Sequence, residues 1–92
     1  MVTNDELKHI VEGLNSTLSA ELSDGARDVV VIEERPFENM YNHEFFYFLN
    51  GKVVVSKDAL NDMYPYMNQF ETEKCLYDHI RDELVRRGRL KG

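Results

Sequence analysis

The chain has 92 residues, an apolar content of 42% and a formal net charge of −6 at pH 7. This length and composition predict one globular domain, 1–92, and argue against wholesale disorder. The single cysteine excludes an intramolecular disulfide, and no stretch reaches the roughly 20 apolar residues of a membrane span. Because the N-terminus also lacks the pattern of a signal peptide, a soluble, cytoplasmic protein without membrane contact is expected.

The charge is divided unevenly along the chain. Residues 1–80 carry 15 acidic and 6 basic side chains, a net of −9, whereas residues 81–92 carry a net of +3. Such an acidic body attracts basic partners and repels nucleic acid, because the summed surface charge steers encounters. The segment 86–92 is predicted to be a basic tail that can fray.

The first predicted element is a helix over the first 22 residues. Leucine, isoleucine and valine recur there at three- and four-residue steps and form one apolar stripe. Thr3 and Glu6 have the spacing of a capping box, and Gly25 can adopt the left-handed conformation that follows a helix.

Three strands are predicted next. Residues 29–32 are β-branched throughout, which predicts a central strand. Residues 45–49 and 52–55 are β-prone runs separated only by an Asn-Gly pair, which is typical of a type I′ hairpin turn. The segment 36–44 is the one substantial loop, and loops often carry function.

Two helices complete the predicted domain. Ser56 can cap a short helix that Pro65 limits. From about Glu71, apolar residues at four-residue steps predict a longer helix that Gly88 terminates. The predicted order is therefore α-β-β-β-α-α. It corresponds to an α+β two-layer domain, with a three-stranded antiparallel sheet and helices packed on one face.

Few residues suggest chemistry. Cys75 and His79 stand four residues apart on the last helix, and His43 with Glu44 could complete a metal site from the loop. A free cysteine beside an apolar stripe more commonly packs as a small hydrophobe, and the acidic neighbours disfavour a reactive thiolate. We therefore predict no catalysis, no cofactor and no metal, and a small enzyme or metal-binding protein ranks third among the hypotheses.

The α-β-β-β-α order resembles, in element order only, that of double-stranded-RNA-binding domains. This resemblance implies phosphate binding by basic residues near the last helix, where this chain has Arg86, Arg87, Arg89 and Lys91. That family's last helix begins with lysines, whereas the one here begins Glu-Thr-Glu, and phosphate affinity depends on many cationic contacts. Direct nucleic-acid binding is therefore the alternative hypothesis.

The acidic body supports the leading hypothesis, which is that the protein binds another protein. In element order and acidity, without a shared motif, the chain resembles some small anti-CRISPR inhibitors, and immunity proteins and antitoxins have a similar profile. We predict a small non-catalytic binding protein that mimics nucleic acid and regulates or inhibits a basic, nucleic-acid-handling protein, in the manner of such phage or mobile-element proteins. Its predicted partner-binding residues are Glu33, Glu34, Phe37, Glu38, Met40, Tyr41 and Glu44.

Two further groups of side chains bear on this hypothesis. Carboxylates on the helical side provide a second acidic set: Asp58, Asp62, Glu71 and Glu73. Aromatic residues and methionines also gather around Pro65, where roofing the core is favoured over forming an interface: Met63, Tyr64, Tyr66, Met67 and Phe70. A homodimer that uses a sheet edge or the apolar loop is a plainer alternative.

Overall fold

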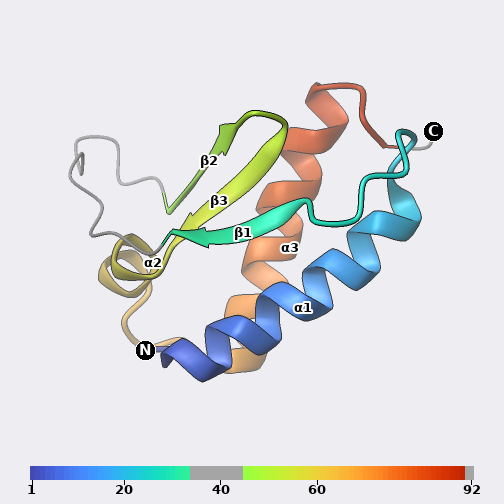
Figure 1. Ribbon diagram of the computed structural model, residues 1–92. Helices are drawn as coiled ribbons and strands as arrows, with labels where there is room; N and C mark the ends of the chain where they lie inside the picture. The colour runs from blue at the N-terminus through green and yellow to red at the C-terminus, as the bar shows by residue number, and fades with distance from the viewer. Residues whose placement is uncertain (34–44, 91–92) are drawn as a thin grey trace.

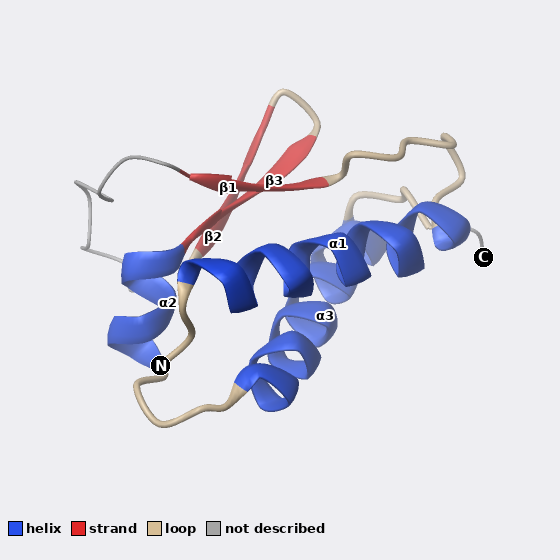
Figure 2. Ribbon diagram, turned by 60° about the horizontal axis from the view of Figure 1, so that its bottom comes forward, coloured by secondary structure: helices blue, strands red, loops and turns tan. Residues whose placement is uncertain are grey.

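The computed structural model describes residues 1–33 and 45–90 (Figure 1). The elements along the chain are α1 (Asn4–Glu21), β1 (Val30–Glu33), β2 (Phe46–Leu49), β3 (Lys52–Ser56), α2 (Lys57–Met63) and α3 (Gln69–Arg86). The sheet lies over α1 and α3, which share one side of it (Figure 2). The predicted α+β class is confirmed.

Two of the predicted helix caps are confirmed. The Thr3 hydroxyl accepts from the backbone N–H of Glu6 at 3.2 Å, and the Glu6 carboxylate accepts from the Thr3 N–H at 3.0 Å. Ser56 caps α2 by accepting from the N–H of Ala59 at 3.3 Å. Both caps satisfy N–H donors that the start of a helix leaves unpaired.

Helix α3 begins two residues earlier than expected. The Asn68 side chain accepts from the backbone N–H of Glu71 at 2.9 Å, and the Glu71 carboxylate completes a capping box. Glu71 is therefore the third residue of the helix and not its start. At the other end Arg87 is the C-cap and Gly88 has φ +70°, as the sequence predicts for a terminator.

The hairpin between β2 and β3 is confirmed with its predicted turn. Asn50 has φ +53° and Gly51 has φ +79°, the two positive values that a type I′ turn requires. The turn closes on the pair Leu49 and Lys52 and so fixes the register of the antiparallel strands.

The predicted antiparallel sheet is wrong, because the sheet is mixed. The strand order is β1-β3-β2, with β1 parallel to β3, and the spatial order differs from the order in the chain. Strand β1 lies at an edge, so the prediction that residues 29–32 form the central strand is also wrong. The central strand is β3, whose residues 53–55 are all buried.

The core lies between the sheet and the two long helices. Alternate residues of the strands, such as Val30, Val53 and Val55, point toward α1 and α3. The predicted apolar stripe of α1 and the apolar residues spaced four apart on α3 pack against these strand residues. The fully buried side chains of these helices include Leu7, Ile10, Leu14, Leu18, Leu76, Ile80 and Leu84.

Candidate functional site

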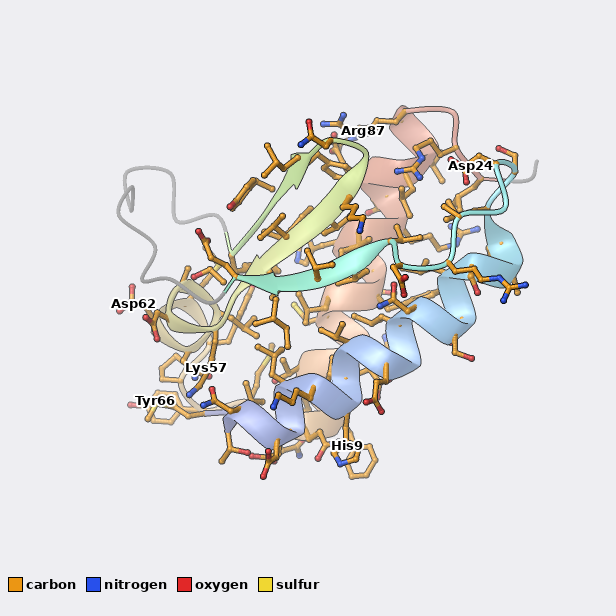
Figure 3. All side chains as sticks on the ribbon, in the orientation of Figure 1. His9, Asp24, Lys57, Asp62, Tyr66 and Arg87 are labelled. Atoms are coloured by element: carbon orange, nitrogen blue, oxygen red, sulfur yellow. The ribbon has the colours of Figure 1, made fainter. Side chains whose placement is uncertain are left out.

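Four carboxylates from three elements lie at one end of the molecule. Asp5 is in the first turn of α1, Glu33 ends β1, and Asp58 and Asp62 stand one turn apart on α2. Glu33 is in register with Ser56, so β1 ends where α2 begins. We call Asp5, Glu33, Asp58 and Asp62 the acidic end; Figure 3 labels Asp62 there.

The N-terminal segment is held against α2 by a reciprocal pair of hydrogen bonds. The backbone N–H of Val2 donates to Asn61 Oδ1 at 2.9 Å, and Asn61 Nδ2 donates to the Val2 carbonyl at 3.1 Å. The Met1 amino group donates to the carbonyl of Pro65 at 2.8 Å. The segment and α2 form the walls of an open groove of about 900 Å³, which is lined by Met1–Asp5, Lys57, Asp58, Asn61 and Asp62.

The carboxylates of the acidic end are not used in ion pairs. Asp5, Asp58 and Asp62 are exposed, and within residues 1–33 and 45–90 none of them pairs with a cation. Lys57 and the Met1 amino group are the cations lining the groove, so these two groups and the acidic end together carry −2. Such a surface creates a negative potential that favours a basic partner.

Glu33 differs from the other three carboxylates because it is half-buried. Its Oε2 atom is buried and has no hydrogen-bond partner among residues 1–33 and 45–90. A buried acceptor without a donor is costly, typically by about 1–3 kcal/mol. A donor supplied by a bound partner would remove that cost.

Exposed apolar side chains border the acidic end. Met1 is 72% exposed and Tyr66 is 96% exposed, and both lie where the amino terminus meets the loop after α2. Phe70 is also exposed, whereas Tyr64 packs against the core. The expectation that this aromatic cluster roofs the core therefore holds for Tyr64 and is wrong for Tyr66 and Phe70.

At the end of the molecule opposite the acidic end, Arg89 stabilises the fold through hydrogen bonds within the chain. Its guanidinium donates to Asp24 Oδ2 at 2.9 and 3.1 Å and to the Gly51 carbonyl at 2.7 Å. It thus joins the loop after α1 to the hairpin turn. Hydrogen bonds from the N–H of Ala26 and from Arg89 hold the pKa of Asp24 below its usual value.

Two more arginines at this end have partners within the chain. The Arg87 guanidinium lies 3.9 Å from the centre of the Phe48 ring, and its Nε is 3.3 Å from Glu83 Oε1. Arg86 pairs with Oε2 of the same glutamate at 3.2 Å. Figure 3 shows Arg87 and Asp24 far from Asp62. The charged groups are therefore separated into an acidic end and an end where Arg86, Arg87 and Arg89 are paired.

Cys75 and His79 lie near the core and do not form a metal cluster. Cys75 is half-buried beside Tyr64, and burial, with a hydrogen bond to Cys75, raises the pKa of the Tyr64 hydroxyl. His79 stacks edge-on against Phe45, with ring centres 5.4 Å apart. Among the described residues no three His, Cys, Asp or Glu side chains are placed to hold a metal ion.

Most of the predicted loop site lies outside the described residues. This applies to Glu34, Phe37, Glu38, Met40, Tyr41 and Glu44, to His43 of the metal hypothesis, and to Lys91 of the basic tail. Their roles stay predictions. The sequence reasoning missed Asp5 and Met1, because only the contact between Val2 and Asn61 reveals that the amino terminus lies beside α2.

None of the helices in the described part of the chain is long and apolar enough to cross a membrane. Comparison with protein-family models, curated proteins and solved structures found no match to this chain. Function must therefore be inferred from the charges and contacts described above.

Proposed function

We propose that this protein is a small acidic binding protein that regulates or inhibits a basic, nucleic-acid-handling protein, and that it performs no catalysis. The observation that carries the proposal is the unequal use of charge. The carboxylates of the acidic end have no ionic partners within the described chain, whereas Arg86, Arg87 and Arg89 each have one or more. The acidic end therefore gathers unpaired negative charge on one surface, whereas these three arginines are already paired.

The acidic end also has the composition of a protein interface. Binding surfaces commonly place aromatic residues and methionine at the centre and charged residues at the rim. Met1 supplies exposed apolar area in the groove beside Asp58 and Asp62, and the exposed Tyr66 belongs to the loop after α2 that the amino terminus contacts. Carboxylates in this setting attract lysine and arginine over a Debye length of about 8–10 Å and chiefly raise the association rate.

Direct binding of nucleic acid is the alternative, and the contacts of the arginines weigh against it. Phosphate affinity comes from several cations that are free to contact the backbone. Arg89 would first have to leave Asp24 and the Gly51 carbonyl, and Arg87 would have to leave Glu83. The same contacts do support another role for these arginines, which is to hold the C-terminal segment against the domain.

A capture experiment with matched charge variants tests the proposal. The wild type and the variant D5N/D58N/D62N are immobilised and exposed to lysate at a series of salt concentrations, with duplex DNA added as a competitor. We expect the wild type to retain one or a few basic proteins that high salt and DNA both displace. The triple variant should lose them, because it removes three unpaired negative charges from one surface.

The control variant E12Q/D28N/D82N changes net charge equally. Its three carboxylates are exposed and have no ion pairs among the described residues, and none of them lines the groove. Equal loss of binding in both variants would show that net charge alone is responsible, and would contradict the proposed surface. A gel shift of duplex RNA or DNA by the wild type that disappears on truncation after Gly88 would favour the alternative function.

A further inference from the structure

The two edges of the sheet are protected to different extents. Strand edges present unpaired N–H and C=O groups that readily bind another strand, and proteins usually block them. In this chain β1 forms one edge and β2 forms the other. The hydrogen-bond pattern shows which groups on each edge are left without a partner.

On β1 a helix side chain blocks the edge. The Val29 carbonyl accepts from Val53, so alternation turns the groups of Val30 and Ile32 away from β3. Asn15 of α1 accepts from the Val30 N–H at 2.8 Å and donates to the Val30 carbonyl at 2.8 Å, as a neighbouring strand would. Within β1 as the structure describes it, only Ile32 is left with outward groups, and one residue is too short a ladder to bind a strand.

On β2 no such device is present among the described residues. The Ser56 N–H donates to the Phe45 carbonyl, so Tyr47 and Leu49 also face β3, and Phe46 and Phe48 face outward. Neither of these two residues hydrogen-bonds outward to any part of 1–33 or 45–90. The strand contains no charge and no proline, the features that commonly protect an edge.

We propose that β2 is a self-association edge that pairs antiparallel with β2 of a second copy of this chain. The unpaired groups are self-complementary about a two-fold axis at Tyr47. In that register Phe46 faces Phe48 of the second copy and Phe48 faces its Phe46. All four outward N–H and C=O groups of each strand then find partners, and the two sheets join as one. Closed two-fold pairing of this kind is the commonest form of homo-oligomer.

The charged side chains beside β2 are complementary to those of a second copy, which favours pairing with this chain. Helix α3 follows β2 in the same direction, because His79 contacts Phe45 and Arg87 contacts Phe48. A two-fold axis therefore sets the two α3 helices antiparallel. Arg86 and Arg87 of one copy, whose side chains stay 75% and 48% exposed beside Glu83, then approach Asp82 of the other. Opposite charges meet there, although each whole chain carries −6.

Sedimentation equilibrium of the purified protein over a range of concentrations tests this inference. We expect a reversible dimer. The variants Phe48→Pro and Phe48→Ala form a matched pair, because both lose the ring but only proline also loses the outward N–H. The dimer dissociation constant of Phe48→Pro should exceed that of Phe48→Ala by roughly tenfold or more.

Hydrogen exchange of the wild-type protein provides a measurement that does not depend on a variant folding. The amides of Phe46 and Phe48 should become protected as concentration rises, while exposed amides such as that of Asn50 should not. A chain that stays monomeric to about 1 mM would overturn the inference. So would a dimer in which the exchange of the Phe46 and Phe48 amides is independent of concentration. Either result leaves the proposal about the acidic end untouched.

Discussion

Replacing Asn15 with alanine should destabilise the protein although the residue lies on a helix, where alanine is normally the better choice. The Asn15 amide makes two hydrogen bonds of 2.8 Å to the backbone of Val30. Val30 is only 1% exposed, so water has little access to the groups that the substitution would leave unpaired. The contact also fixes the position of β1 relative to α1.

The expected loss of stability follows from these two contacts. A hydrogen bond of this kind contributes about 1 kcal/mol net, and a buried group left without its partner costs about 1–3 kcal/mol. Alanine gains roughly 0.5 kcal/mol of helix propensity over asparagine. The net effect should be a loss of about 2 kcal/mol, which lowers the Tm of a domain of this size by roughly 10 °C.

Urea denaturation followed by circular dichroism measures this loss, with Thr17→Ala as the matched control. Thr17 is exposed on the same helix and makes no hydrogen bond through its side chain among the described residues, so its replacement reports helix propensity alone. We expect Asn15→Ala to unfold at a lower urea concentration than the wild type. Thr17→Ala should unfold at the same urea concentration as the wild type or at a higher one. Equal stability of the two variants would refute the role assigned to Asn15.

Three other substitutions probe the turn, the arginine end and the cysteine. Gly51→Val should cost on the order of 1–3 kcal/mol in thermal unfolding, because φ is +79° there and β-branched residues are strained at positive φ. Asp24→Asn should lower stability at neutral pH. Since the pKa of Asp24 is lowered by Ala26 and Arg89, the stabilising effect is present above the ordinary carboxyl pKa and is lost as pH falls through the lowered value, so the wild type and the variant should converge in acid titrations. Cys75→Ala should lower the Tm modestly and leave zinc content at zero by metal analysis; stoichiometric zinc in the wild type would contradict this.

Local signals in the sequence were sufficient for the helix caps and the hairpin. Thr3 with Glu6, Ser56, and the pair Asn50 and Gly51 act through atoms within three residues of one another. Their geometry is set by backbone preferences and short hydrogen bonds, so a pattern in the sequence predicts it directly.

The pairing of the strands depended on contacts that no local pattern contains. A β-branched run reads equally well as an edge strand or a central strand, and here burial of residues 53–55 places β3 at the centre. Gly13 is a similar case, because the sequence marks it only as a weak helix former. A Cβ atom there would lie 2.5 Å from Glu73 Oε1, a contact across α1 and α3 that the flexible Glu73 side chain could relieve by moving.

Among the three exposed carboxylates of the acidic end, one is not explained by folding. Asp5 and Asp58 lie in the first turns of their helices, where a negative charge interacts favourably with the helix dipole. Asp62 lies in the last turn of α2, where the dipole opposes it, and it stands four residues from the like charge of Asp58. Both effects lower stability by a few tenths of a kcal/mol each. We therefore expect Asp62→Asn to stabilise the protein and, at the same time, to weaken partner binding. That combination would show that Asp62 serves binding and not the stability of the fold.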